Sequence, residues 1–169
     1  MKINKSLDPI VNINARVLIL GSMPGEESLR RQEYYGYPRN HFWPLMAEIS
    51  GFDLPDSYNE RISMLDRIGI ALWDVIGSCF REGSLDTNIK DEEPNDLFRI
   101  IEEMIGLRVV IFNGQKSAKS FKRHFGFTSL EQAGIEYRVM PSTSPANTAG
   151  YEKKLAAWSE IKNFIFKNS

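Results

Sequence analysis

The chain has 169 residues with a formal net charge of −1, and 42% of them are hydrophobic and 25% charged. These values predict one globular domain over residues 1–169 with a sizeable core. A near-neutral chain excludes strong non-specific binding of nucleic acid by the whole surface, although one basic face stays compatible with it. The lone cysteine, Cys79, cannot form an internal disulfide, so we expect a cytoplasmic protein, and no apolar run predicts a membrane span.

Apolar runs and capping signals predict strands that alternate with helices. In chain order they predict a strand over 17–20, helices over 42–49 and 57–67, a strand over 70–73, a long polar loop over 77–93, a helix over 95–105, a strand over 109–112, a basic helix over 116–125, a strand over 137–140 and a helix over 151–166. This alternation favours an α/β fold, a three-layer, doubly wound, mostly parallel four-stranded sheet with helices on both faces.

The turns that follow the four predicted strands begin at Gly21, Asp74, Asn113 and Pro141. In sheets of this kind, ligands bind beyond the carboxyl ends of the strands. We therefore expect these turns to meet at one edge of the sheet and to form a single site.

The first turn, Gly21 to Gly25, has two interpretations. Its glycines would let backbone N–H groups approach a ligand closely, but a plain strand-to-helix connection fits as well. No Gly-Lys-Ser/Thr closes the turn and no GxGxxG is present, so the usual nucleotide-binding motifs are excluded.

Tyr34, Tyr35 and Tyr37 stand in a polar stretch beside Gly36 and Pro38 that is unlike simple core. Tyrosines beside a strand end suit stacking against a planar ligand such as a base, and the alternative is that they plug the edge of the core. We expect at least one of them to stack on a ligand.

Asn40 and Asp74 each allow a structural and a chemical role. Asn40 could cap the following helix, or its amide could position water or contact a base edge. Asp74 ends a strand, where a carboxylate can act on a ligand or cap the next turn. The two histidines, His41 and His124, and the lone cysteine show no metal-ligand spacing.

Two further segments could meet phosphates. Lys116, Lys119, Lys122 and Arg123 concentrate charge on one helix, which is either a solvated face or a phosphate-binding one. The segment 142–147 is rich in hydroxyls, and it suits either phosphate contacts or a plain connection.

The motif GSMPG, its continuation YYGYPRNHFW and the later PSTSPAN together resemble the uracil-DNA glycosylase superfamily. Their order and the strands between them cover nearly the whole chain. Within the superfamily the chain is most similar to the hypoxanthine-DNA (deoxyinosine) glycosylase branch, and then to the mismatch-specific uracil-DNA glycosylases.

Departures from the uracil-specific pattern favour that branch. Met23 stands where uracil-specific members place the Asp or Asn that handles water, whereas Asn40 matches the asparagine that the hypoxanthine branch uses instead. Ser142 replaces a histidine, and Ala146 replaces the leucine that is pushed into the duplex. The resemblance therefore implies a weaker wedge, or a different residue in that role.

The resemblance implies a monofunctional enzyme of base excision repair, which hydrolyses the N-glycosidic bond of a flipped-out deaminated base in double- or single-stranded DNA. Hypoxanthine is favoured and uracil is compatible; no metal or organic cofactor is needed, and we expect a monomer that does not bind membranes. Asn40 would position the attacking water. The implied base contacts are Ser22, Met23, Pro24, Gly25, Tyr35 and Asp74. The implied DNA contacts are Ser142, Thr143, Ser144, Pro145, Ala146 and Asn147.

Two other classes compete with this hypothesis. A non-catalytic nucleic-acid or nucleotide-binding module on the same fold would bind without releasing a base, and its binding would survive Asn40→Ala. A small-molecule hydrolase using Asp74 would turn over free nucleosides and would not depend on a DNA backbone.

Overall fold

The computed structural model describes residues 3–167 and contains the predicted four-stranded parallel sheet. Its strands are β2 (Val17–Gly21), β3 (Ile70–Asp74), β6 (Val109–Asn113) and β7 (Glu136–Met140). The spatial order is β3-β2-β6-β7, and every neighbouring pair is parallel. The sequence prediction of this sheet is therefore confirmed.

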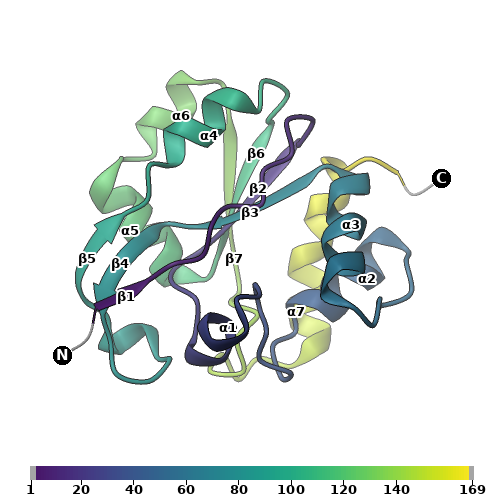
Figure 1. The fold of residues 1–169 in the computed structure, drawn as a ribbon. Helices are drawn as coiled ribbons and strands as arrows, with labels where there is room; N and C mark the ends of the chain where they lie inside the picture. The colour runs from purple at the N-terminus through teal and green to yellow at the C-terminus, as the bar shows by residue number, and fades with distance from the viewer. Residues whose placement is uncertain (1–2, 168–169) are drawn as a thin grey trace.

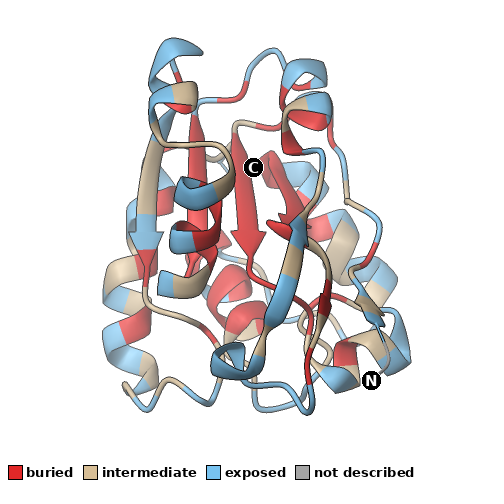
Figure 2. Ribbon diagram, turned by 90° about the vertical axis from the view of Figure 1, so that its left-hand side faces the viewer, coloured by how far each residue is buried: buried red, intermediate tan, exposed pale blue. Residues whose placement is uncertain are grey.

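Helices cover both faces of the parallel sheet (Figure 1). One face carries α2 (Phe42–Ser50), α3 (Tyr58–Ile68) and α7 (Tyr151–Trp158), and the other carries α4 (Leu97–Glu103), α5 (Gln115–His124) and α6 (Thr128–Gln132). Because both faces are covered, β2, β3 and β6 are buried along their whole length, which Figure 2 shows as red strands inside a pale outer layer. The three-layer α/β architecture is thus as predicted.

The helix boundaries follow the capping residues. The Ser57 side chain accepts a hydrogen bond from the Glu60 N–H at the start of α3, and Gly51 and Gly69 end α2 and α3 in the left-handed conformation. The predicted helix over 151–166 is shorter, because α7 gives way to a 3-10 helix over Ser159–Asn163. The short α1 (Glu26–Arg31) and α6 were not predicted.

The prediction of one polar loop over 77–93 is wrong. This segment contributes most of β4 (Ile76–Phe80) and of β5 (Lys90–Pro94), which pair antiparallel and are joined through a 3-10 turn at Asp86–Asn88. A third strand, β1 (Ile3–Lys5), pairs with the other edge of β4 and gives the order β1-β4-β5. In β5, KDEEP is entirely polar apart from its proline and mostly exposed, so the apolar alternation that normally marks a strand is missing.

The small sheet has its own apolar cluster, formed by Ile76, Cys79 and Met23. This cluster ties the sheet to the turn that follows β2. Within residues 3–167, no helix combines the length and the apolar character needed to cross a membrane.

Candidate active site

A cavity of about 900 Å³ opens at the carboxyl ends of the four parallel strands. Each strand lines it with its last residue, Gly21, Asp74, Asn113 or Met140. The predicted convergence of the strand ends at one edge is therefore confirmed.

The cavity brings together every residue that the sequence marked as a site residue, whereas their individual roles stay predictions. They are Ser22, Met23, Pro24, Gly25, Tyr35, Asn40, Asp74, Ser142, Thr143, Ser144, Pro145, Ala146 and Asn147. The sequence reasoning missed one wall, formed by residues 84–87 of the β4–β5 connection. The sequence signal for this wall was weak, because residues 84–87 have the composition of an ordinary polar loop.

Gly21 leaves room for two oxygen atoms at the floor of the cavity. A Cβ atom at this position would lie 2.4 Å from Asp74 Oδ1 and 3.3 Å from the Tyr35 hydroxyl oxygen. Asp74 Oδ1 can therefore approach the strand end as it does only because this residue has no side chain, and the Tyr35 hydroxyl would be crowded by one.

Asp74 is a buried carboxylic acid, only 3% exposed, and its Oδ2 has no hydrogen-bond partner within residues 3–167. Burial is the main reason that the pKa of Asp74 rises to about 7, and the charge of Asp86 adds to the rise, whereas Arg81 opposes it. Near neutral pH this group can therefore hold a proton that an exposed aspartate would have lost.

Tyr35 lies on the cavity wall in a constrained conformation. Its φ of 53° is in the left-handed region, and its ring stacks on Phe42 with centroids 4.0 Å apart. Within residues 3–167 its buried hydroxyl makes no hydrogen bond of ordinary geometry, although the Asn113 side chain is close enough to oppose the rise in the Tyr35 pKa that burial causes. Tyr37 is exposed at the mouth. Tyr34 is buried in the core and its hydroxyl donates to the Asp8 carbonyl at 2.6 Å, so it follows the alternative of a core plug, although it also lines the cavity.

Asn40 both caps a helix and lines the cavity. Its Oδ1 accepts a hydrogen bond of 2.9 Å from the Phe42 N–H at the start of α2. The next residue, His41, donates its backbone N–H to the Thr143 carbonyl at 3.0 Å. This contact places the start of α2 beside the serine-rich loop.

The loop 142–147 is held in shape by its own polar groups. Thr143 is fully buried, and its hydroxyl and N–H both pair with the Asn113 side chain at 3.0 Å. The Asn147 side chain donates to the Ser142 carbonyl at 3.0 Å, and the Ser144 N–H donates to the Ser142 hydroxyl at 3.2 Å. A preformed loop of this kind can present hydroxyls and N–H groups without an ordering cost.

Lys154 supports the same loop from inside the protein. It is fully buried, and its Nζ lies 3.2 Å from both His41 Nδ1 and the Ser144 carbonyl. Burial lowers the pKa of Lys154, and burial followed by the charge of Lys154 lowers the pKa of His41. The lowered pKa favours the neutral imidazole of His41, whose Nδ1 can then accept a hydrogen bond from Lys154.

Hydrogen bonds fix the wall formed by residues 84–87 against the turn after β2. The Ser22 hydroxyl donates to Asp86 Oδ1 at 2.7 Å, and the Ser84 hydroxyl accepts from the Glu26 N–H at 2.9 Å. Between these residues Leu85 is 53% exposed at the mouth of the cavity. A large apolar side chain is therefore held outward on a fixed loop.

The basic helix α5 contributes one residue to the cavity. Lys116 lines it and pairs with the nearly inaccessible carboxylate of Glu92 at 2.6 Å, and His124 binds the same carboxylate at 3.0 Å. Lys119 and Lys122 are exposed. Across residues 3–167, no group of three or more His, Cys, Asp or Glu side chains is placed to hold a metal ion.

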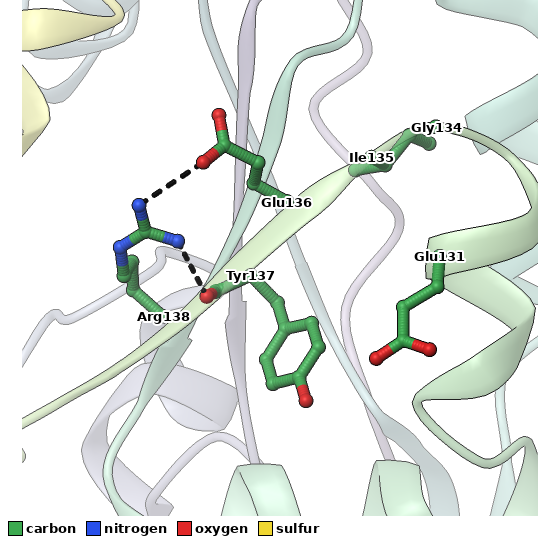
Figure 3. Close-up of a pocket in the computed structure, with 6 residues that line it drawn as sticks. All are labelled: Glu131, Gly134, Ile135, Glu136, Tyr137 and Arg138. Atoms are coloured by element: carbon green, nitrogen blue, oxygen red, sulfur yellow. Dashed lines mark hydrogen bonds and ion pairs between the residues drawn. The ribbon is translucent and has the colours of Figure 1, made fainter.

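A separate hollow lies along β7, lined by residues 134–138 and by Glu131 of α6 (Figure 3). Arg138 lies at one side of it, with bonds to Glu136 and to the Tyr137 carbonyl. It shares no residue with the cavity at the strand ends and has none of the predicted site residues.

Residues 9–164 match the model of the family described as the Uracil DNA glycosylase superfamily. The chain is 40% identical to a "Hypoxanthine DNA glycosylase" of Methanosarcina barkeri, with 90% of this chain and 93% of that one covered. It is 36% identical to a protein of the same name from Methanosarcina acetivorans, with 94% and 98% covered. A solution NMR structure from M. acetivorans, of a candidate uracil DNA glycosylase, superposes with a TM-score of 0.82 at 36% identity and covers 95% of this chain and 97% of that one.

Proposed function

This chain belongs to the uracil DNA glycosylase superfamily, and from that premise we propose that it is a DNA glycosylase that releases a deaminated base, hypoxanthine by preference. The observation that carries the proposal is the single cavity at the strand ends, because both sequence motifs and all their marked residues line it. Its volume of about 900 Å³ admits a base with its sugar.

The reaction requires the target nucleotide to leave the duplex, since the glycosidic bond is out of reach in a stacked helix. The flipped base would stack on Tyr35, whose ring is already braced by Phe42. Asn40 would hold the attacking water beneath the sugar carbon. Hypoxanthine pairs poorly with thymine, so it costs less to extrude than a normal base does.

The preformed loop 142–147 would bind the DNA backbone through hydroxyls and N–H groups, and Lys116 would add a positive charge at the wall. We propose a monofunctional, monomeric enzyme in the cytoplasm. Lys154 is fully buried and Lys116 is paired with Glu92, so neither is presented as a free amine for Schiff-base attack. Borohydride should therefore trap no covalent complex with DNA, and strand cleavage should need alkali.

The direct test compares base release from identical duplexes that carry one hypoxanthine, uracil or xanthine. We expect alkali-dependent cleavage that is strongest for hypoxanthine. Binding of the duplex without release of any base would contradict the proposal and favour a binding module. Turnover of free deoxyinosine as fast as that of the duplex would favour a small-molecule hydrolase.

Leu85 is our candidate for the side chain that fills the gap left by the flipped nucleotide, because Ala146 is too small for this role. Leu85→Ala should slow release from duplex DNA by about 10- to 100-fold, since burying a leucine side chain is worth roughly 1.5–3 kcal/mol. Release from a single strand, which has no stack to open, should change little. Single-turnover rates on both substrates measure the difference.

Ile105→Ala is the matched control for Leu85→Ala, because Ile105 is 94% exposed and does not line the cavity. It should leave both rates unchanged. An equal loss on duplex and single-stranded DNA for Leu85→Ala would show that Leu85 does not act as a wedge.

A further inference from the structure

Asp74 provides a group that the water-positioning role of Asn40 does not use. Its carboxyl lies on the cavity floor, where its Oδ1 is next to Gly21 and its Oδ2 has no partner among the described residues. Burying such a group without a partner is costly, and natural proteins retain this cost mainly at sites with a chemical task.

The surroundings of Asp74 favour a neutral carboxyl that can donate. Tyr34 and Tyr35 offer no positive charge, and Asp86 places a second carboxylate on the same cavity wall. Arg81 is the nearby cation, and its charge opposes the rise in the Asp74 pKa. Its guanidinium donates to the Pro24 carbonyl, whereas its Nε and Nη1 have no partner among the described residues. A proton on Asp74 relieves the repulsion between the two carboxylates.

We propose that Asp74 donates this proton to a ring nitrogen of the departing purine, so that it acts as the general acid of the reaction. The inference rests on the proposed glycosylase function. The C1′–N9 bond breaks with its electron pair passing into the purine, and the purine takes the proton from Asp74. The water oxygen bonds to C1′, and the proton that the water loses restores the Asp74 carboxyl directly or through solvent.

This role also explains a preference for hypoxanthine over uracil. A purine keeps basic ring nitrogens, N7 and N3, on which a proton neutralises the leaving group. Uracil has no such nitrogen, because both of its ring nitrogens are already substituted or protonated. A proton donor at the floor therefore accelerates the loss of a purine more than that of a pyrimidine.

The first experiment measures the single-turnover rate of hypoxanthine release against pH for the wild type and Asp74→Asn. The wild-type rate should fall about tenfold for each pH unit above roughly 7, because the donating form is lost there. Asp74→Asn should be slower by about 10²-fold or more at low pH and should lack this slope. If ionisation of the hypoxanthine N1–H caused the fall of the rate with pH, that fall would remain in Asp74→Asn.

The second experiment changes the base, first with the wild-type enzyme and then with Asp74→Asn. Duplexes with 7-deaza- or 3-deazahypoxanthine each lack one acceptor nitrogen, and the analogue that resists release identifies the protonated atom. Asp74→Asn should not slow that analogue further, and it should slow uracil release far less than hypoxanthine release.

Asp86→Asn should move the wild-type pH profile to lower pH, because one negative charge near Asp74 is gone.

Thermal unfolding checks that Asp74→Asn folds. It also tests whether the Asp74 carboxyl of the folded wild type carries a proton. The folded carboxyl keeps its proton up to about pH 7, whereas an unfolded aspartate loses it near its ordinary value of 3.8. The contribution of Asp74 to the stability of the wild type therefore falls as pH rises between these values, and Asp74→Asn should lack this contribution. The variant should melt higher than the wild type at pH 8 and close to it at pH 4.

Two outcomes separate the inference from the function on which it rests. If the wild type releases hypoxanthine but its rate rises with pH, or if both deaza analogues are released normally, Asp74 reads the base as a carboxylate and the inference is wrong. If the wild type releases no base from any duplex, the proposed function itself fails.

Discussion

Asn40→Ala is expected to lower the single-turnover rate of hypoxanthine release by about 10²- to 10³-fold. Removing one group that positions a reactant or supports a transition state costs this much in other enzymes. The loss should appear in the rate at saturating enzyme, while binding of the lesion duplex stays near that of the wild type. Alkali-dependent cleavage and a binding titration measure the two quantities separately.

The cap made by Asn40 requires its own control. Because its Oδ1 accepts from the Phe42 N–H, Asn40→Ala should also cost about 1 kcal/mol of stability. Asn40→Asp keeps an acceptor oxygen and should preserve the cap. Asn40 would have only a structural role if Asn40→Ala kept full activity. The same would follow if its single-turnover rate fell only as far as its loss of stability explains.

Phe42→Ala should be the most damaging substitution of a residue outside the cavity lining. Phe42 is fully buried, stacks under Tyr35 and packs edge-on against Trp43 at 5.0 Å. Truncating a buried phenylalanine costs roughly 3–5 kcal/mol. The variant should also lose base release at temperatures where it is folded, because the ring that braces Tyr35 is missing.

Phe121→Ala separates these two effects. Phe121 is equally buried, but it belongs to the aromatic cluster around Phe112 on the other side of the sheet. We expect Phe121→Ala to lower the denaturant midpoint about as much as Phe42→Ala does. It should nevertheless release the base at a near-normal rate below its melting temperature. Equal activity in the two folded variants would mean that Tyr35 does not need its stacked support.

The sequence predicted the parts of the molecule that depend on local, strongly patterned signals. The apolar runs predicted β2, β3, β6 and β7, and Gly51 and Ser57 marked the end of α2 and the start of α3. Because parallel strand ends share one edge, their convergence on a cavity followed from the order of the elements alone.

The parts that the sequence could not give depend on distant contacts. The strands β1, β4 and β5 carry no clear alternation, and β5 is stabilised by its pairing with β4 and by Glu92, which binds Lys116 from α5. The wall with Leu85 and Asp86 was missed for the same reason. The sequence could not show that Tyr34 is more deeply buried than Tyr35, because this difference depends on neighbours far along the chain, such as Asp8.

The pairing of β1 with β4 has a practical and a kinetic consequence. Residues 3–5 pair with residues 78–80, so this edge of the small sheet cannot close until two segments that are far apart in the sequence have met. Contacts between segments so far apart form late and slow folding. Foreign sequence placed next to β1 should therefore disturb a strand that borders the segment leading to Leu85.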